Sequence, residues 1–395
     1  MAAAIAETLA YPPGPPHRAA WAQSLSTGPA GIALLHTERA ATGLAPRQPV
    51  HTWLATATRT TLTTGLQAGL FLGAPAVAFA VHTAAGPQRY TRALAALDTR
   101  IAALTRQRLH TAQARMDRAE RPVLAEFDLI NGLTGLGAHH LHRDPHGSLL
   151  REVLDYLVLL TQPVAGLPGW WTHQPPTGRR DPGYPGGHAN HGIAHGIAGP
   201  LALLSLAARA GIHVDGHTTA IRRICAWLDT WRQDHRTGPW WPETLTLHDL
   251  QEHRPTQQAP GRPSWCYGTP GLARAQQLAG QATGDTSRQR TAEDALAGCL
   301  ADPRQSAHLT EPGLCHGMAG LFQTAWHIAS DALSPDLADH LPALASRLQA
   351  AAPDDGHGFL RGAAGRALAL CTAAADRPPA TGWDTCLLLN APGGT

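Results

Sequence analysis

Two short segments in the second half of the chain carry cysteines, and the second segment adds a histidine. Residues 264–271 read SWCYGTPG and residues 314–320 read LCHGMAG. Cys266, Cys315 and His316 offer two thiolates and one imidazole to a single metal ion. A catalytic zinc has three protein ligands and one open position, whereas a structural zinc is normally closed by four protein ligands. The three residues therefore predict a zinc site with a vacancy, and with it an enzyme that activates a group at the metal.

Each of these residues also has an ordinary structural interpretation. A free cysteine often behaves as a small buried hydrophobe, and a single histidine on an apolar face is usually a hydrogen-bonded core residue. Cys266 and Cys315 lie 49 positions apart, and no CxxC pair matches the pattern of a structural zinc site. Spacing alone leaves both interpretations open, so the segments around these residues have to decide between them.

Both cysteine segments belong to an internal repeat, a Gly-x-x-Gly step followed by an apolar run at helical spacing. The seven steps begin at Gly28, Gly73, Gly132, Gly196, Gly268, Gly317 and Gly362, and Ala76 replaces the second glycine of the second step. Their first positions are 45, 59, 64, 72, 49 and 45 residues apart, which is too irregular for a stack of identical units and suits helix pairs with variable connections. A glycine step allows a close backbone approach where a helix begins.

The segments that follow the steps predict an all-α protein. Leu201, Leu204 and Ala208 recur at helical spacing, and alanine and leucine fill the other periodic stretches. Aromatic residues make up 5% of the chain, and no long run alternates as a half-buried strand does. Seven inner helices, each paired with an outer helix, close most simply into a ring in which loops from distant repeats meet at a central mouth. We expect this ring to form one domain over residues 1–395.

Five segments carry a resemblance to a known family, and together they span nearly the whole chain. The strongest are residues 192–200 (GIAHGIAGP), 265–271 (WCYGTPG) and 315–320 (CHGMAG), and the weaker are residues 127–135 (FDLINGLTG) and 358–365 (GFLRGAAG). With these segments the sequence resembles the LanC family of lanthipeptide cyclases. The resemblance implies an α/α toroid, a double ring of seven inner and seven outer helices, with a metal near one end of the central cavity.

The resemblance also implies the metal and the reaction. Cys266, Cys315 and His316 would be the ligands of Zn2+. A free thiol has a pKa of about 8.5, and metal coordination deprotonates it, so a cysteine of a dehydrated precursor peptide would enter the fourth position as a thiolate. Addition of that thiolate to a dehydroalanine or dehydrobutyrine of the same peptide forms the thioether ring of lanthionine or methyllanthionine.

Four further residues are candidates for the steps that accompany this addition, which leaves an enolate that must be stabilised and then protonated. His195 is the candidate for the proton transfers, and Asp128 would orient its imidazole. Arg262 and Tyr267 are candidates to stabilise the enolate oxygen. Ordinary roles stay open for all four: a structural histidine, an aspartate that caps the following turn, an arginine that binds a backbone carbonyl, and a tyrosine that only packs.

Composition excludes several other functions. The 31 basic and 29 acidic side chains give a net charge of +2, without the polycationic character of a nucleic-acid binder. All the basic residues are arginines, since the sequence contains no lysine. A Schiff-base lysine and a P-loop lysine are therefore absent, which excludes aldolase-like, pyridoxal-phosphate and Walker-type nucleotide chemistry.

The sequence predicts a cytoplasmic protein. Its N-terminus lacks the basic start of a secretory signal, and no stretch approaches the 18 apolar residues of a membrane span. Cys225, Cys299, Cys371 and Cys386 are then expected to be reduced packing residues. Residues 89–118 predict a long amphipathic helix or helix pair. Residues 162–187, rich in proline and glycine, predict an ordered loop over the mouth that guides the peptide.

Three functions remain in play at this stage. The first is the peptide cyclase, with a dehydrated precursor peptide as substrate and a dehydratase as partner. The second keeps the zinc but adds an external thiol such as glutathione to dehydrated peptides. The third is a non-catalytic scaffold that holds a precursor peptide or a partner enzyme. An open metal site favours the two enzymes, because a scaffold has no use for one.

Overall fold

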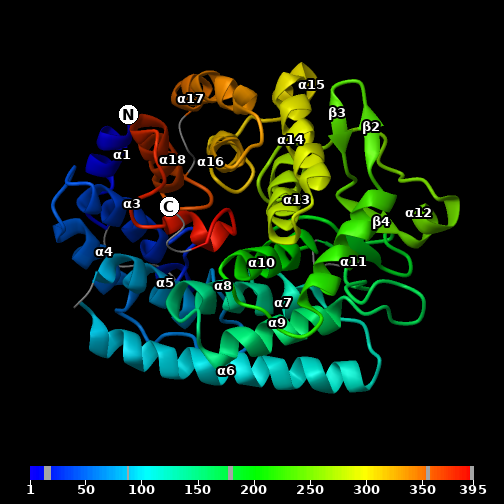
Figure 1. Cartoon of the computed structure of the whole chain (residues 1–395). Coiled ribbons are helices and arrows are strands. Elements are labelled where there is room, and N and C mark those ends of the chain that lie inside the picture. The colour runs from blue at the N-terminus through cyan, green and yellow to red at the C-terminus, as the bar shows by residue number, and fades with distance from the viewer. Residues whose placement is uncertain (13–18, 87–88, 177–180, 353–355, 392–395) are drawn as a thin grey trace.

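The regular secondary structure of the protein is almost entirely helical (Figure 1). Its computed structural model describes residues 1–12, 19–86, 89–176, 181–352 and 356–391. Within these ranges the strands are four segments of three residues each, in two antiparallel pairs. The pairs are β1 (His188–Asn190) with β4 (Thr244–Thr246), and β2 (Gln233–His235) with β3 (Gly238–Trp240). The predicted all-α class is confirmed.

Seven helices form a closed inner ring. They are α3 (Pro29–Ala41), α5 (Ala74–Ala85), α8 (Leu133–Arg143), α10 (Ala198–Arg209), α13 (Thr269–Thr283), α16 (Met318–Ser330) and α18 (Ala363–Ala375). Each contacts the next in this order, and α18 contacts α3, which closes the ring. Most of their residues are buried, because each inner helix is covered on one side by its neighbours and on another by an outer helix.

Seven outer helices each pack mainly on one inner helix, and most of them also touch the next inner helix along the ring. They are α4 (Gln48–Ala57), α6 (Thr91–Asp117), α9 (Ser148–Leu160), α11 (His217–Thr230), α14 (Thr286–Ala301), α17 (Leu341–Ala350) and, on α18, the N-terminal α1 (Ala2–Thr8). The double ring of seven inner and seven outer helices is thus confirmed. The remaining elements are the short α2 (Ala19–Ala22), α7 (Leu124–Phe127), α12 (Leu247–Glu252), α15 (Pro303–Ala307), η1 (Pro335–His340) and η2 (Trp383–Leu387).

The glycine steps mark the starts of the seven inner helices, and the second glycine of six of them has one shared function. A Cβ added there would lie 1.9 to 2.7 Å from the carbonyl oxygen of the residue six positions earlier. These glycines are Gly31, Gly135, Gly199, Gly271, Gly320 and Gly365. The loop before each helix therefore folds back onto the first helical turn, and only a residue without Cβ admits that approach. Among the first glycines only Gly73, Gly268 and Gly362 have positive φ, so close approach is the more general requirement.

Substitution of Gly320 by alanine is expected to destabilise the protein by about 3 kcal/mol, the upper end of the range for overpacking. The new Cβ would meet the Leu314 carbonyl oxygen at 1.9 Å and the Trp265 Cβ at 3.3 Å. Gly65→Ala is the matched control, because no atom lies within 4 Å of its added Cβ, and it should change stability by less than about 0.5 kcal/mol. Urea unfolding of both variants checks the difference. Equal midpoints would show that the close approach is not required.

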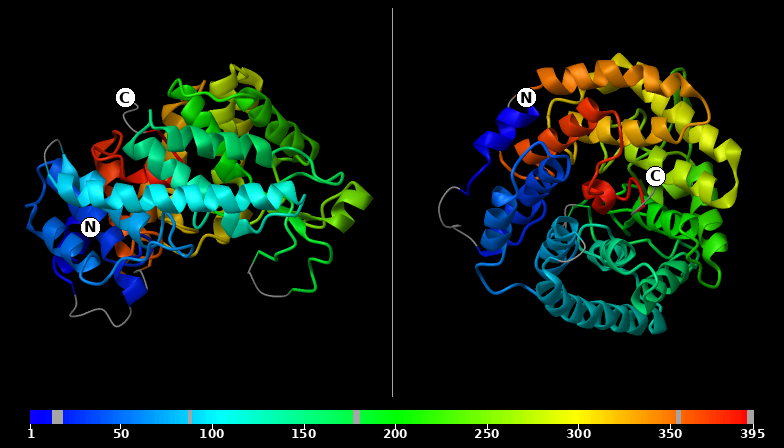
Figure 2. Two further views of the ribbon diagram at one scale, coloured as in Figure 1. Left: turned by 90° about the horizontal axis from the view of Figure 1, so that it is seen from below. Right: turned by 60° about the vertical axis from the view of Figure 1, so that its left-hand side comes forward.

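The C-terminal segment fills the centre of the ring, as the right-hand view of Figure 2 shows. The indole Nε1 of Trp265 donates a hydrogen bond to the Leu387 carbonyl at 3.0 Å. The buried Arg274 donates through Nε to the Leu389 carbonyl at 2.8 Å. Trp265 directly precedes the first candidate ligand, Cys266, so the C-terminal segment supports the backbone that carries this cysteine.

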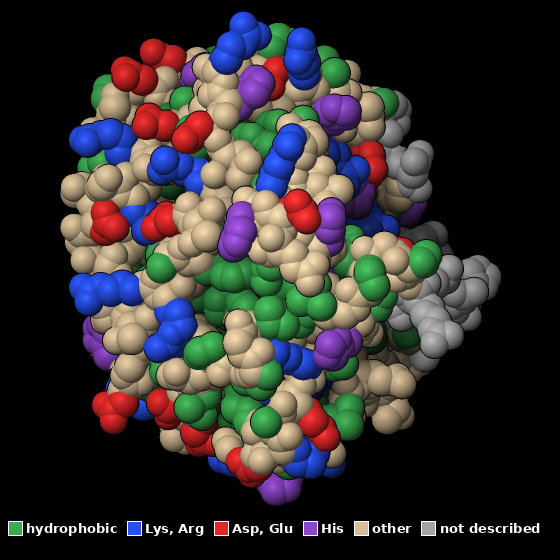
Figure 3. Space-filling view, turned by 90° about the vertical axis from the view of Figure 1, so that its right-hand side faces the viewer, with side chains coloured by type: hydrophobic (Ala, Val, Ile, Leu, Met, Phe, Trp, Pro, Cys, Tyr) green, Lys and Arg blue, Asp and Glu red, His purple; other side chains and the backbone are tan. Residues whose placement is uncertain are grey.

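The surface in Figure 3, on the side of α12, α14, β2 and β3, carries acidic, basic and histidine side chains interspersed around an apolar strip. No charge of one sign dominates this face, in keeping with the balanced composition. Within the described ranges, no helix is both long and apolar enough to cross a membrane.

Two predicted segments can be compared with the structure. Residues 91–117 form the single helix α6, which confirms a long helix in this part of the chain. Trp170 and Trp171 of the segment 162–187 are buried, and the Trp171 Nε1 donates to the Gly186 carbonyl at 3.0 Å. Residues 177–180 lie outside the described residues. None of the described residues of this segment lines the cavity of the candidate site, so its part in guiding a peptide stays a hypothesis.

Candidate metal centre

The structure brings Cys266, Cys315 and His316 to one point. One ligand atom of each, the two Sγ atoms and a ring nitrogen, lies within 4.8 Å of the others. Cys266 is buried and the other two are partly exposed. Across the described residues this is the one cluster of three or more potential metal ligands, and no fourth cysteine, histidine or carboxylate joins it. The predicted ligand set is therefore assembled, with its fourth side free of such a side chain.

The ligands meet because neighbouring loops of the ring are hydrogen-bonded in register. The Cys266 amide donates to the Cys315 carbonyl at 3.1 Å, and the Cys315 amide donates to the Leu360 carbonyl at 2.9 Å. The Leu360 amide continues to the Ser26 carbonyl at 2.9 Å, and on the other side the Ala194 amide donates to the Cys266 carbonyl at 3.4 Å. Residues at the same place in successive repeats therefore lie side by side around the axis of the ring.

A cavity of about 390 Å³ adjoins the three ligands, and the same two positions of successive repeats form its wall. These are the two residues directly before the first glycine of a step. Five repeats contribute both residues: Ser26 and Thr27, Ala194 and His195, Cys266 and Tyr267, Cys315 and His316, and Leu360 and Arg361. The third repeat, whose step begins at Gly132, contributes Ile130. Arg262 completes the lining, and none of the described residues that form it is an Asp or Glu. The cavity is thus bordered by cationic and imidazole side chains and by the two thiols.

The electrostatics of the two cysteines favour one thiolate, at Cys266, because their shared hydrogen bond lowers the pKa of Cys266 and raises that of Cys315. The hydrogen bond from Cys315 is the largest effect that lowers the pKa of Cys266 to about 4, with smaller contributions from His316 and Ser264, and burial opposes it. The Ser264 Oγ lies 3.6 Å from the Cys266 Sγ. The site therefore stabilises a thiolate, which is the form of cysteine that binds metals.

His316 is prepared for coordination through one of its nitrogens. Its Nε2 lies 2.7 Å from the Glu311 Oε2. A ring that donates from Nε2 keeps the lone pair of Nδ1 for a metal. A carboxylate on the far side of a ligating imidazole is the usual support of such a ligand. The donor set and this support fit a zinc ion held by Cys266, Cys315 and His316.

His195 and Asp128 form a hydrogen-bonded pair at the cavity. The His195 Nδ1 lies 2.6 Å from the Asp128 Oδ2. Burial disfavours the charged imidazole, but the hydrogen bond and the charge of Asp128 outweigh it, so the pKa of His195 is raised above its usual value. The other oxygen of Asp128 accepts hydrogen bonds from the backbone amides of Asn131 and Gly132 at 2.6 and 2.8 Å. Asp128 thus caps its turn and orients the histidine at the same time.

Tyr267 and Arg262 also lie at the cavity. The Asn190 Nδ2 donates a hydrogen bond to the Tyr267 hydroxyl at 2.9 Å, and burial raises the pKa of this phenol above its usual range. The Arg262 Nη1 lies 3.7 Å from the Glu311 Oε1. Each of the two side chains therefore has a polar partner at the cavity, and their part in a reaction stays a prediction.

Two charged residues at the site, Arg361 and Glu311, were not predicted from the sequence, and the repeat contains the signal for both. Arg361 lines the cavity from the position that His195, Tyr267 and His316 occupy in their own repeats. Glu311 stands six residues before the first glycine of its step, as Arg262 does in the preceding repeat. Alignment of the repeats on their glycines would have identified both positions.

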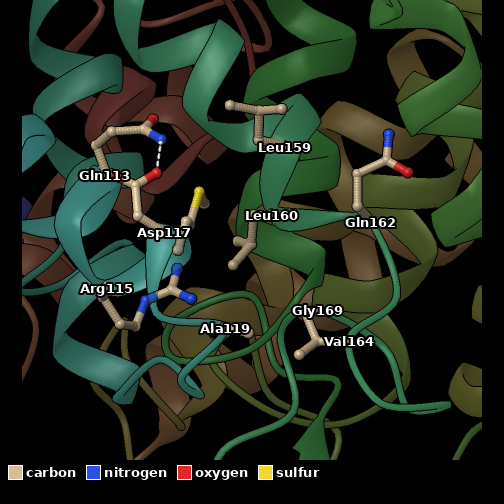
Figure 4. A pocket seen from close by; sticks show the side chains of 10 residues that line it. Gln113, Arg115, Asp117, Ala119, Leu159, Leu160, Gln162, Val164 and Gly169 are labelled. Carbon is tan, nitrogen blue, oxygen red and sulfur yellow. Dashed lines mark hydrogen bonds between the residues drawn. The ribbon is translucent and has the colours of Figure 1, made fainter.

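Another cavity, of about 300 Å³, lies between α6 and the end of α9 (Figure 4). Three of its polar side chains, those of Gln113, Arg115 and Asp117, are already paired. The Arg115 Nη2 lies 2.8 Å from the Glu126 Oε1, and the Gln113 Nε2 donates to the Asp117 Oδ1 at 2.7 Å. It contains no cluster of metal ligands, so among the described cavities the one beside Cys266 is the candidate for chemistry.

The ring of helix pairs and the three clustered ligands define an α/α toroid with a candidate metal centre at its mouth. Comparison with known proteins gives the family. The model of the lanthionine synthetase C-like proteins matches residues 19–388, and the chain belongs to this family.

Two relatives illustrate the likeness. The nisin biosynthesis protein NisC of Lactococcus lactis subsp. lactis is 24% identical over 268 residues, which are 66% of this chain and 62% of that protein. The solved structure of nisin cyclase superposes with a TM-score of 0.77 at 21% identity and covers 98% of this chain and 95% of its own. The second comparison supports the toroid fold.

Proposed function

We propose that this protein is a zinc-dependent lanthipeptide cyclase. In this proposal it joins a cysteine of a dehydrated precursor peptide to a dehydroalanine or dehydrobutyrine of the same peptide. The observation that carries the proposal is the cluster of Cys266, Cys315 and His316 beside a cavity whose described lining residues include no carboxylate. Membership of the lanthionine synthetase C-like family supports the same chemistry.

The three ligands have one task in this proposal, which is to hold Zn2+ with a position left for a substrate sulfur. Zinc bound there supplies positive charge that lowers the pKa of an incoming thiol, so that the thiolate forms near neutral pH. The remaining chemistry falls to side chains around the cavity.

His195 is the proton carrier in this proposal. Its imidazole faces the cavity, and Asp128 accepts a hydrogen bond from Nδ1, which leaves Nε2 to exchange protons with the substrate. Nε2 takes the proton of the substrate thiol. When the sulfur adds to the β-carbon, the pair of electrons of the double bond moves toward the carbonyl, and His195 then returns the proton to the α-carbon. No atom is gained or lost, so the ring is an isomer of the open peptide.

Arg262 and Tyr267 stabilise the negative charge that develops on the substrate carbonyl oxygen. The guanidinium supplies a fixed cation, and the Tyr267 hydroxyl supplies a hydrogen bond, since Asn190 already donates to its oxygen. Groups that are oriented before the reaction stabilise such charge without reorganising. A dehydratase partner and a location in the cytoplasm stay predictions from the sequence.

The test is incubation of the purified protein with a dehydrated peptide that carries one cysteine, with and without glutathione. The proposal predicts loss of the free thiol at unchanged mass. A mass increase by one glutathione would instead show that the protein adds external thiols. If the peptide binds but keeps both its free thiol and its mass, the protein is a non-catalytic scaffold. Either of the last two results would overturn the cyclase.

A further inference from the structure

Glu311 joins two functional side chains of the candidate site. One carboxylate oxygen, Oε2, lies 2.7 Å from the His316 Nε2, and the other, Oε1, lies 3.7 Å from the Arg262 Nη1. The Glu311 side chain is 51% exposed and contributes little to the core. Its contacts therefore serve the site more than the stability of the ring.

The fold places Glu311 beside Arg262 through the repeat. The Glu311 carbonyl accepts a hydrogen bond from the Met318 amide at 2.8 Å, which ties it to the start of α16. A Cβ on Gly317 would lie 2.4 Å from that carbonyl oxygen, and a Cβ on Gly268 would lie 2.2 Å from the Arg262 carbonyl oxygen. The two residues thus extend from equivalent points of adjacent repeats.

The short contact to His316 has a chemical consequence. A carboxylate that accepts a hydrogen bond from Nε2 fixes the tautomer in which Nδ1 carries the lone pair. It also holds the plane of the ring and makes Nδ1 more basic. A ring nitrogen of His316 lies within 4.8 Å of both Sγ atoms, and since Nε2 is in contact with Glu311, Nδ1 is the nitrogen left for a metal.

We propose that Glu311 is a positioning residue of the metal centre. Its carboxylate fixes His316 as a ligand through Nδ1 and holds Arg262 at the cavity wall. The first half rests on the metal centre alone, and the second half rests also on the proposed cyclase. The two halves can be measured separately, because metal affinity does not depend on the peptide reaction.

Zinc affinity tests the first half. Glu311→Ala should weaken zinc binding by about 10- to 100-fold, the usual loss when the hydrogen-bond partner of a ligand is removed. Glu311→Gln keeps an oxygen that can accept from Nε2, so its loss should be smaller. Competition with a chromophoric chelator measures both, and Glu252→Ala, an exposed glutamate of α12, is the control that should leave the affinity unchanged.

Activity at saturating zinc tests the second half. Glu311→Ala should still close rings more slowly than the unaltered protein, because Arg262 is no longer held. Arg262→Gln should also slow ring closure but bind zinc with unchanged affinity. If the unaltered protein binds zinc and Glu311→Ala binds it equally well, the positioning role is wrong while the cyclase stands. If the unaltered protein binds no zinc, the metal centre and this role are both wrong.

Discussion

Replacement of Cys315 by alanine is expected to abolish zinc binding and ring formation together. Two donors would remain, Cys266 and His316, and the hydrogen bond that stabilises the Cys266 thiolate would be lost as well. Removal of a hydrogen-bond partner of a ligand lowers metal affinity by up to about 100-fold. The loss of a ligand itself should therefore lower zinc affinity by more than this. Elemental analysis of the purified variant gives the zinc content, and thiol titration of a dehydrated peptide gives the rate.

The matched control for this variant is Cys299→Ala. Cys299 is a buried free cysteine on α14, and burial raises the pKa of its thiol to about 12, so it is a packing residue. This variant should keep one zinc per chain and an unchanged rate of ring closure. Ring closure by Cys315→Ala at the rate of the unaltered protein would show that the metal ligands are not needed.

His195→Asn is expected to lower the rate of ring closure by about 100- to 10,000-fold, the usual contribution of a general acid–base residue, and to leave the zinc content unchanged. Among the described residues that line the cavity, the ligand His316 is the one other histidine, so none of them offers an imidazole to replace His195. Asp128→Asn should also slow the reaction, because an amide cannot fix the imidazole tautomer as a carboxylate does.

The pH dependence of Asp128→Asn gives a second measure of the same pair. A histidine that acts as a base works in its neutral form, so the rate rises with pH through the pKa of His195. Asp128 raises that pKa against the opposing effect of burial. Without the carboxylate the pKa falls, and the acid limb of the rate profile should move to lower pH while the plateau drops. A limb that stays in place, or moves to higher pH, would contradict the assignment.

The buried pair of His327 and Asp384 offers a matched control. It has the same 2.6 Å contact between an imidazole nitrogen and a carboxylate oxygen, but neither residue lines the cavity. His327→Asn should therefore lower stability without changing the rate per folded molecule. If His195→Asn and His327→Asn change the rate per folded molecule equally, His195 has no special role in the reaction.

Much of the fold was predictable because the glycine steps encode a packing requirement. At six second glycines a carbonyl oxygen occupies the space that a Cβ would need, and that demand recurs with the repeat. The seven inner helices follow from it. The role of α1 as the outer partner of α18 was not predictable, since the first and last segments of the chain meet only when the ring closes.

The sequence predicted the metal ligands of the candidate site but not all of the residues that support them. Cys266, Cys315 and His316 stand out by chemical type, so their sequence segments were enough. Glu311 and Arg361 are common charged residues whose place at the cavity depends on the register of neighbouring loops. The hydrogen bond between the Cys266 amide and the Cys315 carbonyl sets this register, and no single segment contains that information. The C-terminal residues that support Trp265 escape prediction for the same reason.

The zinc X-ray absorption spectrum of the purified protein, before and after addition of a precursor peptide that has one cysteine but no dehydrated residue and so cannot close a ring, tests the central claim most directly. The account predicts one zinc per chain, bound by two sulfurs, one histidine nitrogen and one exchangeable light atom, and a third sulfur once the peptide is added. Four protein ligands before addition, or an unchanged sulfur count after it, would contradict the account.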